Sequence, residues 1–337
     1  METATITLAH GAGGRASDEL IRSVVLPALG GASDMTLCDA ALISNPGERI
    51  AFTTDGFTVT PLFFPGGNIG RLAVFGTVND LAMVGAVPRY LALSIIAEEG
   101  LPMESLRSVL REVGNAAREA SVRIVTGDTK VVGSGAVDKL FLTTAGIGTV
   151  GGDVPLLSPD QACPGDVVLV SGTMGDHGVA VLSAREGLSF TPQITSDCAP
   201  LAHLAGVLLA AAPSLRCMRD PTRGGLASVL NEFARAADAG FEIQEDAVPV
   251  RREVAALSEI LGLDPLYLAN EGKLVAVVGP RDADRALSAL RAHPLGLEAR
   301  AIGTVNADHR GLVVMRTGIG TRRIVEYPTG ELLPRIC

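Results

Sequence analysis

The residue best suited to covalent chemistry is the cysteine at position 337, the last of the segment Pro334-Arg335-Ile336-Cys337. No amphipathic pattern before it is long enough to anchor this segment, and chain ends are usually poorly ordered unless they are docked. A thiol on such an end can enter one active site, leave it modified and then reach a second protein. The sequence therefore predicts a mobile tail with a reactive thiol, and the simpler alternative is a frayed end that carries a cysteine.

Three aspartates stand where a protein could hold Mg²⁺ and a nucleotide. Asp55 and Asp128 each follow an apolar run of strand length, and open α/β sheets bind ligands at strand ends. Asp80 interrupts an expected helix at 69–84 that is apolar on nearly every side, where a carboxylate needs a partner. Mg²⁺ commonly takes one or two carboxylates together with phosphate oxygens. We therefore predict a Mg²⁺–nucleotide site. Taken alone, Asp55 and Asp128 are of a kind that is more often a turn residue, and the alternative for Asp80 is a structural hydrogen bond to a neighbouring backbone group.

A lysine and a glutamate complete the candidate site. Lys130 lies two residues beyond Asp128, so its ammonium could point at phosphates, although such a lysine is more often solvated surface. Glu271 precedes an apolar strand, where partial burial would raise its pKa toward that of a general base. On its own, a glutamate in this position is more often a turn residue than a catalyst.

The segment 218–226 leads into an expected helix and contains Asp220, Thr222 and Arg223 followed by two glycines. Free N–H groups, glycines and a basic side chain meet there at a positive helix end, which is a typical anion-binding place. The segment is not a Walker A motif because no Gly-Lys-Ser/Thr follows, and two glycines alone are weak evidence.

Composition narrows the class of protein. The chain has 337 residues, which is long enough for two domains, and its 47% apolar and 19% charged residues are typical of a globular protein. A net charge of −9 argues against a nucleic-acid partner. No signal peptide or apolar run of about 18 residues is present, and the five cysteines suggest neither a zinc site nor a disulfide framework. We expect a cytoplasmic protein without a membrane partner.

Hydrophobic periodicity predicts strands mixed with helices, an α/β (α+β) fold. The turn-rich stretch 151–155 marks a domain boundary. We expect an N-terminal α/β domain at 1–155, a C-terminal α/β domain at 156–320 and a tail at 321–337. The expected strands are 50–54, 90–97, 122–126, 140–149, 167–171, 273–278, 299–305 and 312–315, and the expected helices are 69–84, 102–120, 176–186, 201–212 and 222–239.

Taken together and in order, eight segments resemble the HypE family, the carbamoyl dehydratases of NiFe-hydrogenase maturation. The resemblance runs nearly end to end, and the final PRIC is its most specific part. One small departure is Ser258, where many relatives carry a cysteine. The segments are HGAGGR, FTTDGFTVTPLFFPGGNIG, GTVNDLAMVGAVPRYL, TGDTKVV, GDHG, MRDPTRGGLASVLNE, GLDPLYLANEGKL and PRIC.

The resemblance implies a fold like that of aminoimidazole ribonucleotide synthetase and selenophosphate synthetase. The N-terminal domain would bind ATP and form a homodimer by pairing its strands with those of a second subunit, while the C-terminal domain covers the nucleotide. The implied cofactors are ATP and Mg²⁺. The implied partners are HypF as carbamoyl donor and a HypC–HypD complex as acceptor of the cyanide.

The implied reaction starts from an S-carbamoyl group on Cys337. ATP would phosphorylate its carbonyl oxygen, a base would remove the N–H protons, and phosphate would depart to leave the S-cyano form. The resemblance implies that Glu271 and Lys130 lie near the incoming tail, and we hypothesise that Glu271 is the base and that Lys130 stabilises charge on the phosphoryl group or orients the thiocarbamate. It implies Asp39, Asp55, Asp80 and Asp220 for Mg²⁺, and Asp55, Asp80, Asp128, Lys130, Asp220, Thr222 and Asn270 for ATP.

Other functions remain to be weighed. Selenophosphate synthesis would need a reactive cysteine or selenocysteine in the N-terminal glycine-rich segment, but the first cysteine is Cys38. Aminoimidazole ribonucleotide synthesis would leave the thiol at the end of the sequence unexplained. An inert carrier of Cys337 has no need of several carboxylates at ligand-binding positions, and ATP hydrolysis that depends on Asp80 would exclude it.

Overall fold

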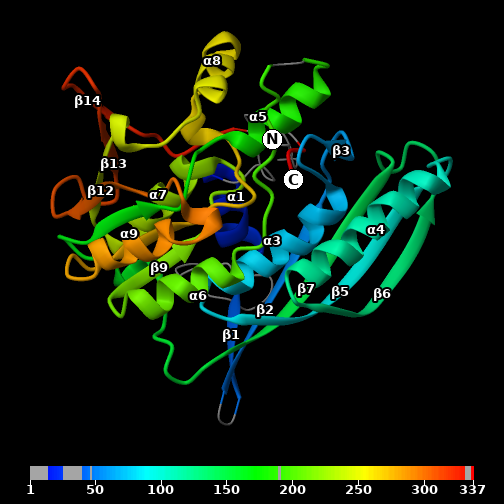
Figure 1. Ribbon diagram of the computed structural model, residues 1–337, viewed down its shortest axis with the longest axis horizontal. Coiled ribbons are helices and arrows are strands. Elements are labelled where there is room, and N and C mark those ends of the chain that lie inside the picture. The colour runs from blue at the N-terminus through cyan, green and yellow to red at the C-terminus, as the bar shows by residue number, and fades with distance from the viewer. Residues whose placement is uncertain (1–13, 26–39, 46–47, 189–190, 331–334) are drawn as a thin grey trace, which may run out of the picture.

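The computed structural model describes residues 14–25, 40–45, 48–188, 191–330 and 335–337. Two main sheets with packed helices form two mixed α/β domains side by side, which confirms the predicted fold class (Figure 1). The last residues of the sequence lie between the two domains, beside β3 and α5 (Figure 1).

The first sheet has the strand order β1-β2-β7-β5-β6. Adjacent strands in this sheet are antiparallel except β5 and β6, which run parallel and are joined through a helix. That connection is expected because parallel neighbours need a crossover. The strands are β1 (Ala41–Asn45), β2 (Glu48–Phe57), β5 (Val87–Glu98), β6 (Arg123–Val132) and β7 (Leu140–Val150).

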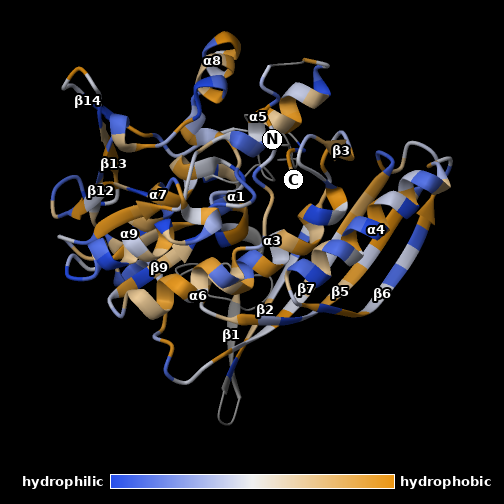
Figure 2. Ribbon diagram, viewed as in Figure 1, coloured by the Kyte–Doolittle hydropathy of each residue, from blue (hydrophilic) through white to orange (hydrophobic). Residues whose placement is uncertain are grey.

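Helix α3 (Ile69–Met83) lies between the first sheet and the second domain. It begins after Asn68, whose side-chain oxygen accepts hydrogen bonds from the N–H groups of Gly70 and Arg71 at 2.8 and 3.2 Å. Its apolar character on nearly all sides is visible in Figure 2 and follows from burial on both faces. Helix α4 (Met103–Glu119), the crossover from β5 to β6, has an apolar face and a solvated face instead.

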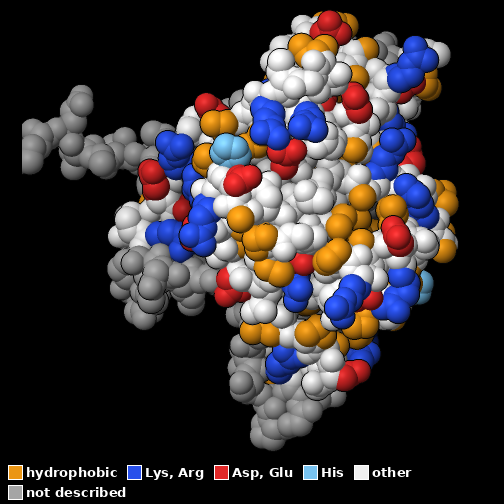
Figure 3. Space-filling view, turned by 90° about the vertical axis from the view of Figure 1, so that its left-hand side faces the viewer, with side chains coloured by type: hydrophobic (Ala, Val, Ile, Leu, Met, Phe, Trp, Pro, Cys, Tyr) orange, Lys and Arg blue, Asp and Glu red, His pale blue; other side chains and the backbone are white. Residues whose placement is uncertain are grey.

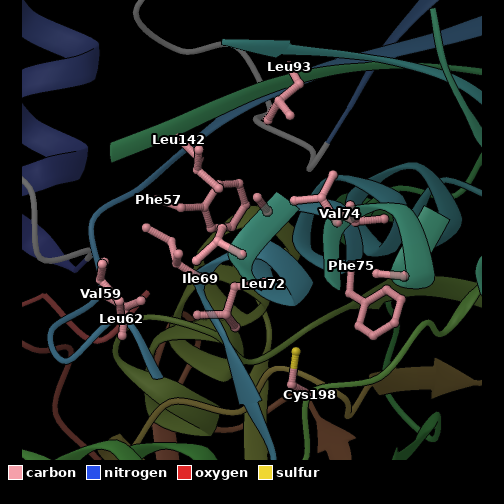
Figure 4. Packing of buried hydrophobic residues seen from close by; sticks show 14 of the residues in the cluster. Phe57, Val59, Leu62, Ile69, Leu72, Val74, Phe75, Leu93, Leu142 and Cys198 are labelled. Carbon is pink, nitrogen blue, oxygen red and sulfur yellow. The ribbon is translucent and has the colours of Figure 1, made fainter. Parts of the chain in front are cut away.

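The core of the first domain forms where α3 meets the sheet. Phe57 on β2 and Leu142 on β7 pack with Ile69 and Leu72 of α3, and all four side chains are at most 2% exposed (Figure 4). Packing is so close that a Cβ on Gly76 would lie 2.9 Å from the Phe57 ring. This contact fixes α3, and therefore Asp80, against the strand that carries Asp55.

The second sheet has the order β14-β13-β10-β12-β8-β11-β9, and only β10 and β13 are parallel. Its strands are β8 (Val167–Val170), β9 (Leu215–Arg219), β10 (Gly240–Gln244), β11 (Val275–Val278), β12 (Arg300–Asn306), β13 (Val313–Arg316) and β14 (Arg322–Ile324). The helices with it are α5 (Asp176–Arg185), α6 (Ala202–Ala211), α7 (Gly225–Ala237), α8 (Arg252–Leu261) and α9 (Ala283–Arg291).

Shorter elements complete the described chain. A two-residue hairpin, β3 (Phe63–Phe64) and β4 (Gly67–Asn68), precedes α3, and α1 (Arg15–Leu20) continues into the π-helical turn η2 (Ile21–Val25). The 3₁₀ turns are η3 (Pro159–Gln161), η4 (Glu245–Ala247), η5 (Pro265–Tyr267) and η6 (Pro294–Gly296).

The expected strands and helices are present, with ends that differ by a few residues. The largest shift at a functional segment is at β6, expected to end at 126 but extending to Val132, so Asp128 and Lys130 lie within the strand and not beyond its end. Helix α7, expected from 222, begins at Gly225, because Gly224 and Gly225 have φ of 75° and 59°, outside the right-handed helical range. The sequence reasoning missed α1, β1, the short hairpin β3–β4, β9, β10, α8, α9 and β14. Since β14 pairs with β13, it extends the second sheet into the region expected to be tail, and the exact domain boundaries stay a prediction.

The surface shown in Figure 3 carries arginines and lysines that are scattered among acidic and apolar side chains. This face therefore does not form the continuous positive stripe that follows a nucleic-acid backbone. Within the described ranges, no helix has the length and apolar character needed to cross a membrane.

Candidate functional site

Residues 335–337 are docked against the first domain. The N–H of Thr58 donates to the carbonyl of Cys337 at 3.0 Å, and the N–H of Thr60 donates to the carbonyl of Arg335 at 3.2 Å. Ile336 is 3% exposed and belongs to the core cluster around α3. The end of the sequence is therefore held by backbone hydrogen bonds and apolar burial rather than by an amphipathic pattern, and its mobility stays a prediction.

Arg335 makes the most side-chain contacts of the docked segment. Its Nε donates to the carbonyl of Thr58 at 2.8 Å, and its Nη1 pairs with Asp138. The guanidinium lies 5.5 Å from the centre of the Phe141 ring. From the other side, Arg185 donates to the carbonyl of Arg335 at 2.8 Å. These contacts fix the direction in which the chain enters the site.

The docked thiol of Cys337 lies in a predominantly acidic environment. Burial raises its pKa, and the nearby carboxylates of Glu271, Asp55 and Asp220 raise it further, while Arg223 lowers it. The sulfur is therefore a protonated thiol at neutral pH. The structure thus brings together four of the residues expected to act in the site and adds Arg223.

Glu271 is 2% exposed, which confirms the burial expected for a general base. Burial raises its pKa well above the ordinary value, and Asp220, Asp197 and Asp55 add to the effect. Its backbone N–H donates to Asp197 at 3.0 Å, while its Oε1 has no hydrogen-bond partner among the described residues. A basic oxygen without a protein partner is available to accept a proton from a bound substrate.

Asp55 and Asp80 lie on β2 and α3, which pack directly against each other. Asp80 is half-buried and accepts a hydrogen bond from the hydroxyl of Thr53 at 2.9 Å, so the partner expected for this carboxylate exists. A Cβ on Gly76 of α3 would lie 3.5 Å from a carboxylate oxygen of Asp55. Burial raises the pKa of Asp55, and Arg223 lowers it.

Arg223 and Asp220 come from the turn between β9 and α7. Asp220 is 5% exposed, and its carbonyl accepts a hydrogen bond from the N–H of Thr222 at 3.0 Å. Arg223 is exposed to solvent, yet the acidic groups around it raise its pKa, Cys337 first and then Asp55, Glu271 and Asp80. Sequence reasoning noted this arginine as an anion-binding residue but did not place it beside the thiol.

Asn270 fixes the backbone beside Glu271. Its Oδ1 accepts from the N–H of Gly175 at 2.8 Å, and its Nδ2 donates to the carbonyls of Pro221 and Leu268 at 3.1 and 3.0 Å. Both amide hydrogens are therefore used in this state, and the role of Asn270 in binding ATP stays a prediction. Asn270 joins the segment before Glu271 to the starts of α5 and α7.

Asp128 and Lys130 lie on β6, the edge strand of the first sheet. They form an ion pair with each other at 2.9 Å, and their side chains are 61% and 66% exposed. The hydrogen bond from Lys130 lowers the pKa of Asp128. Within one subunit, Figure 1 shows β6 at the outer side of the sheet, away from the docked tail. Asp39, the remaining acidic candidate, lies outside the described residues.

The acidic residues suit Mg²⁺ only if a bound nucleotide supplies further oxygen ligands. In the part of the chain that the structure describes, no three histidine, cysteine, aspartate or glutamate side chains converge closely enough to hold a metal ion. Asp55, Asp80 and Asp220 are hard oxygen donors, and Mg²⁺ commonly binds one or two such groups together with nucleotide phosphates. The donor set therefore suits a metal–nucleotide complex rather than a metal ion bound by protein alone.

His177 and Asp197 were not expected in the site. His177 is fully buried, and its Nε2 lies 2.8 Å from the carbonyl oxygen of Ile336. Asp197 bonds the backbone of Glu271 and pairs with Lys273 at 3.2 Å. Neither residue has a spacing typical of a catalytic motif, so only the fold reveals them.

Two family models cover most of the chain. The AIR synthase related protein N-terminal domain matches residues 38–150, and the C-terminal domain of the same family matches residues 163–316. Carbamoyl dehydratase HypE of Rhizobium leguminosarum bv. viciae is 54% identical over 333 residues, covering 98% of this chain and 95% of the relative. Carbamoyl dehydratase HypE of Escherichia coli K12 is 47% identical over 338 residues, covering 98% and 99%.

Solved structures of similar proteins have the same fold. A HypE–HypF complex matches with a TM-score of 0.86 and 47% identity, covering 92% of this chain and 99% of that one. A HypE in complex with ATP matches with a TM-score of 0.83 and 47% identity, covering 99% and 100%. At 18% identity and a TM-score of 0.68, AaThiL complexed with AMPPCP and TMP, which covers 94% and 96%, shares the fold alone.

Proposed function

The chain belongs to the HypE family, the carbamoyl dehydratases of NiFe-hydrogenase maturation, and we propose that it converts an S-carbamoyl group on its own Cys337 into a thiocyanate in an ATP-dependent reaction. The product would supply the cyanide ligands of the hydrogenase iron centre. The observation that carries this proposal is the position of Cys337, which is docked beside the buried carboxyl of Glu271.

The reaction removes the elements of water from the carbamoyl group. Its carbonyl oxygen attacks the γ-phosphorus of ATP, and ADP leaves. Loss of one N–H proton gives an imidate that carries the phosphoryl group on oxygen. Loss of the second N–H proton then breaks the C–O bond, so phosphate departs and S–C≡N remains. Phosphorylation is needed because oxide is a very poor leaving group.

Glu271 is the proposed base for the N–H protons. Its burial and its acidic neighbours make it a stronger base than an exposed glutamate, and its Oε1 has no hydrogen-bond partner among the described residues. Arg223 lies among the same groups and can balance negative charge as the phosphoryl group transfers. We keep Lys130 as a second cationic candidate, which would have to reach the site from another subunit because β6 is at the edge of the sheet.

ATP and Mg²⁺ belong to the proposal as substrate and cofactor. A similar HypE has been solved in complex with ATP, and the starts of α5 and α7 beside Asp220 offer free N–H groups to phosphates. Asp55, Asp80 and Asp220, with Asp39 and Asp128 as further candidates, would hold the metal together with phosphate oxygens, and Thr222 would bind the nucleotide. When bound, Mg²⁺ supplies a positive charge that withdraws electrons from the transferring phosphoryl group.

The proposed homodimer forms through the first sheet. Phe52 on β2, Ile147 on β7 and Tyr90 on β5 are direct neighbours across three strands, and they are 41%, 41% and 43% exposed. A contiguous apolar face of this kind is typical of a protein interface. Covering it with a second copy would also bring Lys130 and Asp128 close to a neighbouring subunit.

Two protein partners are proposed from the family. A similar HypE has been solved in complex with HypF, which we propose as the carbamoyl donor for Cys337. A HypC–HypD complex is the proposed acceptor of the cyanide. A cytoplasmic location belongs to the same proposal, because a reducing compartment keeps Cys337 a free thiol.

The test is the intact mass of the C-terminal peptide after incubation with HypF, carbamoyl phosphate and ATP. We expect Cys337 to gain a carbamoyl group and then lose one water only when ATP is present. Cys337→Ala should gain nothing, and Glu271→Gln should gain the carbamoyl group but stall there. A wild-type chain that is carbamoylated but never dehydrated would be a carrier, and a chain that gains nothing would refute the proposal altogether.

A further inference from the structure

His177 joins three parts of the site. It is the second residue of α5 and is completely buried. The ring of Phe64 packs edge-on against the imidazole, with 5.4 Å between the ring centres. Its Nε2 lies 2.8 Å from the carbonyl oxygen of Ile336, and its Nδ1 lies 2.8 Å from the hydroxyl oxygen of Ser196. Ile336 directly precedes Cys337, so this contact is one peptide away from the thiol.

The hydrogen bonds determine which ring nitrogen carries the proton. The carbonyl of Ile336 can only accept, so Nε2 must be the donor. The hydroxyl of Ser196 already accepts from the N–H of Cys198 at 3.1 Å, and its own hydrogen is free to point at Nδ1. A neutral imidazole with Nε2–H satisfies every group in this chain of contacts. Burial lowers the pKa of His177, which favours the same neutral form.

The residues around His177 also hold the proposed base. The N–H of Gly175 donates to Asn270, and the N–H of Gly178 donates to the carbonyl of Ala269 at 3.0 Å, so both sides of His177 bind the segment that precedes Glu271. Asp197, next to Ser196, accepts the N–H of Glu271 itself. His177 is therefore held by the same segments that hold Glu271, and it also contacts residue 336 of the tail.

Resting on the proposed function, we infer that His177 is a positioning residue, which holds the carbonyl of Ile336 through its Nε2–H and so places the carbamoylated Cys337 at Glu271. Ser196 fixes the imidazole in the donating tautomer. On the other side, the N–H of Thr58 holds the carbonyl of Cys337. The carbonyl of Ile336, before Cys337, and the carbonyl of Cys337 itself are thus hydrogen-bonded to two different segments of the chain. These two bonds restrict where the sulfur can lie.

The sharpest test compares His177→Gln with His177→Asn, which differ by one CH₂. Glutamine presents an amide N–H near the position of Nε2 and retains the bond to Ile336, whereas asparagine presents its polar atoms near the position of Nδ1 and can keep only Ser196. In the ATP-free full-length protein, we measure the rate of Cys337 alkylation by iodoacetamide at fixed pH. Loss of a buried hydrogen bond predicts about 5- to 100-fold faster alkylation for His177→Asn.

His177→Gln should stay within about threefold of wild type because it keeps the donor. Equal alkylation rates in all three proteins would overturn the inference, and so would equal acceleration in both variants. Alkylation needs no catalysis, so its outcome is independent of the proposed function. The dehydration rate is then measured on each S-carbamoylated protein. If wild type never dehydrates, the proposed function fails, whereas dehydration that is equally fast in wild type and His177→Asn removes the positioning role.

A measurement on the wild-type protein tests the inference even if the His177 variants do not fold. The ¹⁵N shifts of the His177 ring report its tautomer, which should be the neutral Nε2–H form in the full chain at pH 7. In a chain that lacks residues 335–337, the Nε2 signal should move as its acceptor is lost. A charged ring, an Nδ1–H tautomer or an unchanged Nε2 signal would each contradict the inference.

Discussion

The contacts of Arg335 predict how strongly the tail depends on one side chain. The hydrogen bond from its Nε to Thr58 joins a charged donor to a backbone carbonyl at 2.8 Å and contributes about 1.5–3 kcal/mol. The ion pair with Asp138 is discounted to about 0.5 kcal/mol, because the two side chains are 31% and 42% exposed. The contact with Phe141 adds about 0.5 kcal/mol.

Arg335→Ala should therefore weaken tail docking by about 2.5–4 kcal/mol, which is roughly a 60- to 700-fold fall in the docking equilibrium constant. The assay is single-turnover dehydration of the S-carbamoylated chain with excess ATP, followed by the mass of the C-terminal peptide. The rate follows the docked fraction, so it should fall by up to the same factor, and the full fall applies where the undocked form already dominates in the wild type. ATP affinity, measured by calorimetry, should change less than about twofold, because the tail is not a nucleotide ligand.

The matched control is Arg323→Ala. Arg323 on β14 pairs with Asp264 at 2.7 Å, with side chains 40% and 34% exposed, but it has no contact with residues 335–337 among the described contacts. It should dehydrate at the wild-type rate. Wild-type dehydration by Arg335→Ala would refute the reasoning, as would a parallel loss of ATP affinity, because docking would then not be what Arg335 contributes.

Four further predictions follow from the same geometry. Because burial raises the pKa of Glu271 above 4.5, its ionisation destabilises the fold as pH rises, so Glu271→Gln should melt higher than wild type at pH 8 and lose that advantage near pH 4.5. Gly225→Ala places a Cβ at φ 59° and 2.5 Å from the carbonyl of Leu268, which should lower the free energy of unfolding in urea by about 2–4 kcal/mol. Phe52→Asp should shift the protein from dimer to monomer in sedimentation velocity. Docking of the free Cys337 thiol should weaken above about pH 8.5, whereas docking of its carbamoyl form should not, as measured by amide exchange of residues 335–337.

Local patterns were enough to predict the elements and part of the site. A carboxylate in an apolar helix needs a partner, and Asp80 has Thr53. A glutamate before an apolar strand was expected to be buried, and Glu271 is. Both inferences depend on the few residues on either side, where periodicity and burial can be read directly from the chain.

Residue type alone does not reveal contacts between distant segments. His177 meets Ile336 across 159 positions, and Arg335 meets Thr58 across 277, so nothing near either residue signals the contact. Asn270 shows that a residue type can also suggest a role that the contacts do not show. Amide side chains often bind ligands, but the amide of Asn270 makes its hydrogen bonds to backbone groups. These outcomes depend on tertiary placement, which only the resemblance to a family could anticipate.

The cluster around Cys337 discriminates between the chemical states of the tail. Glu271, Asp55 and Asp220 disfavour a thiolate, but they do not repel a neutral carbamoyl group, whose N–H donors suit the carboxylate oxygens. Dehydration removes both N–H groups, so the S-cyano product loses those hydrogen bonds while the acidic neighbours remain. Carbamoylation should therefore tighten docking and dehydration should loosen it, as amide exchange of the cyano form can test. The chemical step itself would then release the tail toward its acceptor.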